Sequence, residues 1–156
     1  EIRSEVEIAM IPTRIPKIKG FTLNEFINLS CYNKQNADSD KALKKLALSH
    51  LADRDISTLS DGEFQKGTIA AAIAKGAEII LMDEPTAFLD TENRRNVLST
   101  LRKLCEETGT AVIFSSHDLY EALETCNKVI ALGADRQCHI SSENLKDTIS
   151  AIFSKD

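Results

Sequence analysis

Residues 79–90, with the sequence IILMDEPTAFLD, constrain the fold and function of this chain most strongly. Four apolar residues run directly into two adjacent carboxylates, Asp83 and Glu84. A short continuous apolar run of this kind predicts a buried parallel strand covered on both faces. The acidic pair then lies at the carboxyl end of the strand, where open α/β sheets bind their ligands. One carboxylate there can hold Mg²⁺ and a second can activate water against a phosphate, while a plain acidic turn formed by Pro85 is the alternative.

The composition is that of a globular protein. The 156 residues are 42% hydrophobic and 28% charged, which suits one domain with a substantial core. A net charge of -5 and a pI of about 5.3 argue against a general nucleic-acid-binding surface. No apolar run approaches the ~20 residues needed to cross a bilayer, and the first ten residues show no signal-peptide pattern. The four cysteines form no CxxC pair, which argues against a disulfide framework or a zinc site and favours a reducing cytosol.

Buried-strand patterns alternate with amphipathic segments, and this order predicts an α/β fold with a mainly parallel sheet. We expect strands at residues 6–11, 79–82, 110–114 and 128–132. We expect helices at residues 22–29, 41–51, 63–75, 91–107 and 118–126, with a tail helix over 145–153. The first two helices fall between strands and form a small helical insert.

Two segments carry the residues of a capping box, in which a Ser or Thr and a Glu three positions later satisfy each other's backbone groups. They are Thr22 with Glu25, and Ser60 with Glu63 in the sequence LSDGE. Capping alone explains LSDGE as a local folding device. The functional alternative is that the serine hydroxyl, the backbone at Gly62 and the helix N-terminus present donors to an anion.

The sequence SSHD follows the strand expected at residues 110–114. A histidine after a strand is often only a structural hydrogen-bonding group. If this strand lies beside the one that carries Asp83, then His117 reaches the same edge of the sheet. An imidazole there can donate to a γ-phosphate oxygen.

Together and in this order, these segments resemble the motifs of the nucleotide-binding subunit of ATP-binding cassette (ABC) transporters. LSDGE is similar to the signature motif, IILMDEP to the Walker B strand, TAFLD to the D-loop and SSHD to the switch-histidine loop. The resemblance extends from Glu5 to about Gly133. It implies a P-loop NTPase-like α/β fold with a mainly parallel sheet, flanking helices and a small α-helical insert. The implied organisation is a partial, incomplete ABC ATPase domain over 1–156, with the insert at 21–59 and a core with a C-terminal helix at 60–156.

The resemblance also assigns roles to single residues. Asp83 would coordinate Mg²⁺, and Glu84 would polarise the attacking water as a general base. His117 would contact the γ-phosphate as the second catalytic residue.

Other matching residues would act on the nucleotide of an opposite subunit. Ser60 and Gly62 would contact its γ-phosphate, and Glu63 completes the cofactor-binding signature. Asp90 would act across the dimer interface and link the two sites.

The resemblance implies ATP and Mg²⁺ as cofactors, with no nucleic-acid partner. It implies a second ATP-binding subunit, identical or different, and a membrane permease that docks against the insert, which places the protein in the cytoplasm at the inner face of the cell membrane. FTLNEFINL and LSDGE look most similar to importers of iron-siderophore, haem or cobalamin. A solute-transport ATPase is the function implied, and a non-hydrolysing regulatory module or a soluble non-transport ABC ATPase are the alternatives.

Three features depart from the family pattern. None of the six glycines belongs to the phosphate-binding loop Gly-x-x-x-x-Gly-Lys-Ser/Thr, so we expect that loop upstream of Glu1, a natural loss of the loop being the alternative. This chain alone is therefore expected to bind Mg-ATP very weakly and to be inactive. Thr13 follows Pro12 where the family commonly has glutamine, and it is too short to reach as glutamine does. Asp61 stands where many members have glycine, and its charge suits a phosphate site only if the side chain points away.

Overall fold

The computed structural model describes residues 6–32, 37–118, 123–132 and 138–142. The chain divides into two compact units, residues 1–115 and 116–156, and each is described by itself. None of the helices among the described residues has the length and hydropathy that a bilayer span requires.

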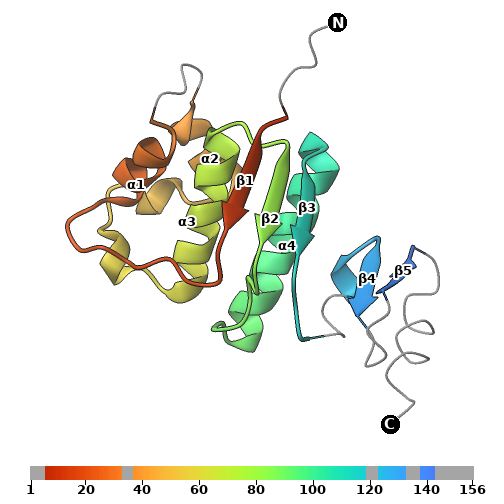
Figure 1. Ribbon diagram of the computed structural model, residues 1–156. Helices are drawn as coiled ribbons and strands as arrows, with labels where there is room; N and C mark the ends of the chain where they lie inside the picture. Colours follow the sequence, from red (N-terminus) through yellow and green to blue (C-terminus); the bar gives the residue numbers. More distant parts are fainter. Residues whose placement is uncertain (1–5, 33–36, 119–122, 133–137, 143–156) are drawn as a thin grey trace, which may run out of the picture. The chain divides into compact units, whose positions relative to one another are not determined.

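Three parallel strands form the sheet of the first unit in the order β1–β2–β3, as Figure 1 shows. They are β1 (Ile8–Ile11), β2 (Ile79–Met82) and β3 (Ala111–Phe114). The register aligns Ile11, Met82 and Phe114 at the carboxyl ends of the strands. The ladder continues one step further, since the Asp83 N–H donates to the Ile11 carbonyl and the Ser115 N–H to the Met82 carbonyl, both at 3.0 Å. The predicted strands are confirmed, and their carboxyl ends meet at one edge.

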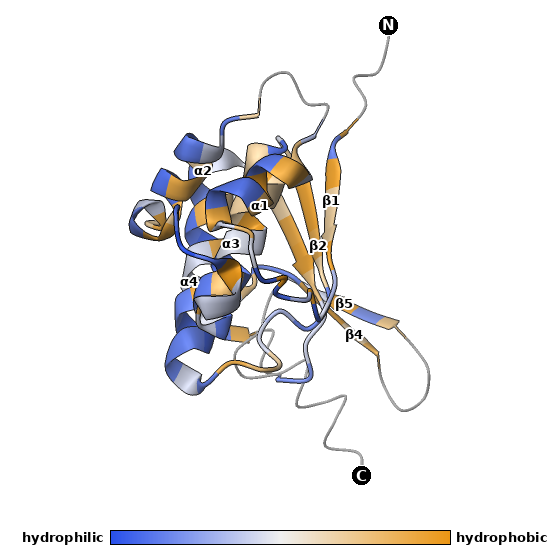
Figure 2. Ribbon diagram, turned by 90° about the vertical axis from the view of Figure 1, so that its left-hand side faces the viewer, coloured by the Kyte–Doolittle hydropathy of each residue, from blue (hydrophilic) through white to orange (hydrophobic). Residues whose placement is uncertain are grey.

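Four helices lie on one side of this sheet, with α3 and α4 against the strands and α1 and α2 packed against α3 (Figure 2). They are α1 (Leu23–Ser30), α2 (Ser39–Lys45), α3 (Asp61–Ala74) and α4 (Thr91–Thr108). On the covered face Ile80 is completely buried. On the other face Met10 and Ile113 are 72% and 57% exposed. Ile79 and Leu81, the β2 residues on that face, are half-buried, and none of the four helices covers them, so among the described residues of this unit the expectation that β2 is covered on both faces is not met.

The starts and ends of three helices follow local signals in the sequence, of which the Thr22–Glu25 capping box was predicted. Thr22 caps α1, with its hydroxyl accepting from the Glu25 N–H at 3.2 Å and the Glu25 carboxylate accepting from the Thr22 N–H at 2.8 Å. Asp90 caps α4, and Gly109 ends that helix in the left-handed conformation at φ 71°. Gly76 follows the end of α3 at φ 82°, a conformation that glycine adopts without a Cβ penalty.

The second helix is shorter than predicted. Instead of running over 41–51, α2 ends at Lys45, and a short 3₁₀ turn (Ser49–Leu51) follows. Ala47 adopts φ 56°, the left-handed region that interrupts a helix. The Leu48 N–H donates to the Leu43 carbonyl at 2.8 Å, which closes the helix end as a Schellman motif does. A second 3₁₀ turn (Ile56–Thr58) leads into α3.

The second unit contains a two-stranded antiparallel sheet of β4 (Val129–Leu132) and β5 (Cys138–Ser141). β4 confirms the predicted strand at 128–132. β5 was not predicted, and it makes β4 part of an antiparallel pair. Of the helix expected at 118–126, residues 119–122 lie outside the described residues and residues 123–125 are helical; all of the tail helix expected at 145–153 lies outside the described residues.

Helix α1 packs against α3 at Gly67. A Cβ atom at this position would lie 2.7 Å from Cδ1 of Leu23, whereas ordinary van der Waals contact is 3.4–4 Å. Leu23 is completely buried, so its side chain has no open space into which to move. A residue with a Cβ atom at position 67 would therefore have to displace the buried Leu23 side chain.

We expect Gly67→Ala to lower the free energy of unfolding by about 1–3 kcal/mol through overpacking. This sign is opposite to the gain of about 1 kcal/mol that alanine gives in an unconstrained helix interior. Urea unfolding of the complete protein that carries this sequence measures the change. In a Leu23→Ala background the same replacement should become neutral or stabilising, and a stabilising effect in the unaltered protein would contradict this packing.

Candidate active site

Two hydroxyl groups hold the carboxylate of Asp83, which lies directly after β2. The Ser115 hydroxyl donates to Oδ1 at 2.8 Å, and the Thr13 hydroxyl donates to Oδ2. Thr13 lies in the loop after β1, and Ser115 follows β3 directly. The three strands therefore each bring one oxygen-bearing side chain to the same edge of the sheet. Thr13 was expected to be too short to reach as glutamine does, but its hydroxyl contacts the Asp83 carboxylate.

Glu84 has an unusual backbone conformation for a non-glycine residue, with φ 47°. The left-handed region costs a residue with a Cβ atom roughly 1–2 kcal/mol. The Glu84 N–H donates to the Ser115 hydroxyl oxygen at 2.9 Å, and the Ala87 N–H donates to the Glu84 carbonyl at 3.2 Å. One serine hydroxyl thus contacts both acidic residues: it donates to the carboxylate of Asp83 and accepts from the backbone of Glu84.

The LSDGE segment forms the start of α3, and its capping box is present. The Ser60 hydroxyl accepts from the Glu63 N–H at 3.2 Å, and the Glu63 carboxylate accepts from the Ser60 N–H at 2.7 Å. The bond from the Ser60 N–H is the main reason why the pKa of Glu63 lies below its usual value. Because a hydroxyl has one proton besides its two lone pairs, accepting from Glu63 still permits Ser60 to act as a donor. The folding role and the anion-binding role of Ser60 are therefore compatible.

Gly62 and Asp90 are connected through Asn93 of α4. A Cβ atom on Gly62 would lie 2.5 Å from Oδ1 of Asn93. Asn93 in turn donates from its backbone and side-chain nitrogens to the two Asp90 oxygens, at 2.8 and 3.0 Å. These bonds lower the pKa of Asp90, with the backbone bond contributing most. Packing of α3 against α4 thus accounts for a glycine at this position, and its close approach to a phosphate stays a prediction.

A hollow of about 520 Å³ lies among the loop after β1, the start of α3 and the segment after β2. Its lining includes Thr13, Arg14, Lys17, Asp61, Phe64 and Glu84. The Arg14 guanidinium lies 4.0 Å from the ring centroid of Phe88 at one wall. The hollow places the half-buried Glu84 and the first turn of α3 around one common space.

The donor atoms around Asp83 are a carboxylate and two hydroxyls. Oxygen donors of this kind suit Mg²⁺ rather than zinc or copper. Among the described residues, no three His, Cys, Asp or Glu side chains gather in a group that could hold a metal by themselves. A magnesium ion at Asp83 would therefore take its remaining ligands from water and phosphate oxygens.

His117 belongs to the second unit and is exposed. Beside it, the Asp118 N–H donates to the Ser116 hydroxyl at 3.0 Å. The expected place of His117 at the carboxylates stays a prediction.

Ser115 contacts Asp83 and Glu84, and Lys17 lines the hollow, but neither was predicted from the sequence as part of this site. Ser115 follows its strand just as Asp83 follows the neighbouring one, so the parallel register was a signal that could have placed them side by side. Lys17 carries no such signal, because the position of its side chain depends on the path of an irregular loop.

A parallel sheet with a carboxylate pair at its carboxyl edge is typical of α/β proteins that bind ligands at that edge. The model of the family described as ABC transporter matches residues 2–87, more than half of the chain, and the chain belongs to this family.

Individual relatives agree with this assignment. The phosphonates import ATP-binding protein PhnC of Shigella dysenteriae is 37% identical over 116 residues, which cover 74% of this chain and 42% of that protein. The solved structure of a metal-chelate type ABC transporter in an inward-facing conformation is 27% identical with a TM-score of 0.82, covering 95% of this chain and 64% of that one. The dimeric ATP-binding cassette MJ0796, bound to ADP and Pi after hydrolysis, is 28% identical with a TM-score of 0.64, covering 80% and 58%. The chain spans less than half the length of PhnC. Its α/β fold with a parallel sheet is that of ABC ATPase domains.

The backbone conformation of Glu84 predicts an ordering of variants at this position. Glu84→Gly should be more stable than Glu84→Ala by about 1 kcal/mol, because glycine adopts positive φ without the Cβ penalty. Urea unfolding of the complete protein measures the difference. Ala47→Gly should also stabilise, since Ala47 has φ 56°, whereas Ala87→Gly, at an exposed position without positive φ, should destabilise. An alanine variant as stable as the glycine variant at position 84 would show that this backbone is unstrained.

Proposed function

We propose that the complete protein that carries this sequence is the ATP-hydrolysing subunit of an ABC importer. One observation carries the proposal: the Asp83–Glu84 pair lies at the carboxyl edge of the sheet, with its orientation held by Thr13 and Ser115. Family membership supports nucleotide as the ligand of this edge. The name of PhnC, an import ATP-binding protein, supports import as the direction.

The residues at this edge divide the chemistry among them. Magnesium, when bound with ATP, supplies positive charge that neutralises the phosphates. Asp83 would hold that ion through its carboxylate, which the two hydroxyls keep in one orientation. Glu84 would accept hydrogen bonds from the attacking water and polarise it as a general base. Because the Ser115 hydroxyl contacts both residues, it keeps the metal-binding group and the base in fixed register.

A second ATP-binding subunit would complete the site. Ser60, Gly62 and Glu63 at the start of α3 would contact the nucleotide held by the opposite subunit, and Asp90 would act across the dimer interface. His117 would contact the γ-phosphate. The dimeric state of the similar cassette MJ0796, bound to ADP and Pi, supports this arrangement.

The helical insert, residues 21–59, would dock against a membrane permease and keep the protein at the cytoplasmic face of the membrane. Helices α1 and α2 of this segment pack against α3, so a movement of the insert would be transmitted to the LSDGE segment. For the cargo we propose a chelated metal such as an iron complex. The FTLNEFINL and LSDGE sequences and the similar metal-chelate type transporter support this class, whereas PhnC is named for phosphonates.

Replacing Glu84 by Gln tests the proposed base. The amide cannot accept a proton, so kcat for ATP hydrolysis should fall by roughly 10²–10⁴-fold while Mg-ATP binding is retained. Phosphate release by the complete protein measures kcat, and titration calorimetry measures binding. Glu92→Gln removes the same charge at an exposed position of α4 and should leave kcat unchanged. Unimpaired hydrolysis by the Glu84→Gln variant would remove Glu84 from the mechanism, and a wild-type protein that binds but never hydrolyses Mg-ATP would favour a regulatory module.

A further inference from the structure

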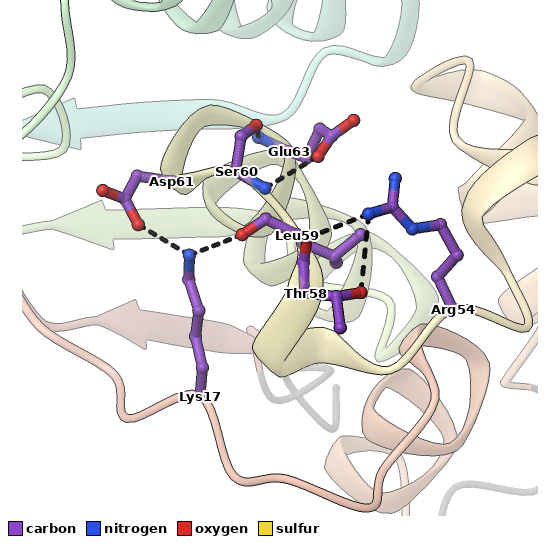
Figure 3. Close-up of polar contacts among 7 residues, drawn as sticks. All are labelled: Lys17, Arg54, Thr58, Leu59, Ser60, Asp61 and Glu63. Atoms are coloured by element: carbon purple, nitrogen blue, oxygen red, sulfur yellow. Dashed lines mark hydrogen bonds and ion pairs between the residues drawn. The ribbon is translucent and has the colours of Figure 1, made fainter.

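Lys17 reaches from the loop after β1 to the segment that starts α3. Its ammonium group donates to the Leu59 carbonyl at 2.7 Å and to Oδ1 of Asp61 at 2.6 Å. Figure 3 shows the ammonium between these two acceptors, with the Asp61 carboxylate pointing toward Lys17 and away from the Ser60–Glu63 pair. The Lys17 side chain is 23% exposed and that of Asp61 is 65% exposed.

Asp61 is the first residue of α3 and lies between Ser60 and Gly62. A carboxylate in the first turn stabilises the helix, because it complements the positive end of the helix dipole. The same charge repels a phosphate that approaches the same end of the helix. If Ser60 and Gly62 receive a nucleotide phosphate, the charge of Asp61 must therefore be compensated.

The partial negative charge of the Thr58 carbonyl, two residues before Ser60, is compensated by a basic side chain as well. The Arg54 guanidinium donates to the Thr58 carbonyl at 2.9 Å and to the Thr58 hydroxyl at 3.4 Å (Figure 3). The carbonyls of two consecutive residues, Thr58 and Leu59, thus each accept from a cation. With Asp61, three negative or partly negative groups at the entry to α3 each face a basic side chain.

Stability alone is a weak explanation for the Lys17–Asp61 pair. Exposed ion pairs contribute little to folding, because water screens them and two long side chains lose freedom. The Lys17 ammonium also lies 5.7 Å from the ring centroid of Phe64, a residue of α3. Both members of the pair line the hollow that Glu84 also lines. The pair therefore contributes to the electrostatic potential that an anion entering this hollow would meet.

We propose that Lys17 is a positioning residue that neutralises and orients Asp61, so that the start of α3 accepts a nucleotide phosphate. The proposal rests on the proposed function above, and it adds the electrostatic requirement that the aspartate of LSDGE creates. Lys17 acts through Asp61 and the Leu59 carbonyl, and it has no assigned contact with the nucleotide. The same loop carries Thr13, four residues earlier, which holds Asp83.

The test measures KM and kcat for ATP hydrolysis by the complete protein in a double-mutant cycle. Lys17→Ala exposes the charge of Asp61 and should raise KM for ATP by about 3- to 10-fold, with kcat nearly unchanged. Asp61→Gly removes the charge that needs a partner, so the double variant Lys17→Ala/Asp61→Gly should return KM to within about twofold of the wild-type value. Lys17→Arg keeps the positive charge and should also keep KM. The increase caused by Lys17→Ala should shrink as salt is raised, because ions screen exposed charges.

Two further variants separate charge from structure. Lys17→Gln keeps a donor for the Leu59 carbonyl while it removes the charge, so it should raise KM as Lys17→Ala does even if the alanine variant folds poorly. Lys19→Ala removes an equal charge from an exposed position of the same loop and should leave KM unchanged.

An unchanged KM in both Lys17→Ala and Lys17→Gln would overturn the inference, and so would a raised KM that Asp61→Gly does not restore. These results leave the proposed function intact, provided that the wild-type protein hydrolyses ATP and Glu84→Gln abolishes hydrolysis. Absence of hydrolysis in the wild-type protein would overturn both.

Discussion

The geometry of the candidate site depends on the two hydrogen bonds of the Ser115 hydroxyl. It donates to the Asp83 carboxylate and accepts from the backbone of Glu84, so that one side chain directly after β3 orients two acidic residues that follow β2. This is possible because the strands are parallel and in register, which brings the residues after Met82 and Phe114 to the same level. The bond to Glu84 also helps to hold a left-handed backbone that would otherwise be strained.

The loop after β1 connects this edge to the start of α3. Thr13 contacts Asp83 at one end of the loop, and Lys17 contacts Asp61 at the other. Between them lies the hollow shared by Glu84 and the first turn of α3. The carboxylates and the LSDGE segment are therefore held by a single stretch of chain, and a shift of that loop would be felt at both.

The sequence predicted the parts of the fold that rest on local signals. The apolar run before Asp83 defined β2, and the cap residues Thr22 and Ser60 marked helix starts, because these effects act within a few residues. The break at Ala47 was missed, since alanine is a strong helix former and the apolar pattern continues through it. β5 was missed because CHIS has little strand character and is stabilised by pairing with β4.

At the site, the sequence and the family resemblance found the acidic pair and the LSDGE segment, but not the groups that orient them. Ser115 was visible only as part of a motif, since its contact with Asp83 depends on strand pairing across more than thirty residues. The contacts of Lys17 could not be predicted, since an irregular loop has no periodicity that indicates where a side chain lies. The exposure of the sheet face that carries Met10 could not be predicted either. An apolar strand reads the same whether the described helices cover one of its faces or both.

The proposed site is tested most directly by a crystal structure of the complete protein with the Glu84→Gln replacement, grown with Mg-ATP. We expect a metal ion held by Asp83 directly or through water, with the hydroxyls of Thr13 and Ser115 still on that carboxylate and residue 84 facing the γ-phosphate. Nucleotide and metal bound elsewhere, with the Asp83 carboxylate turned away from them, would contradict it.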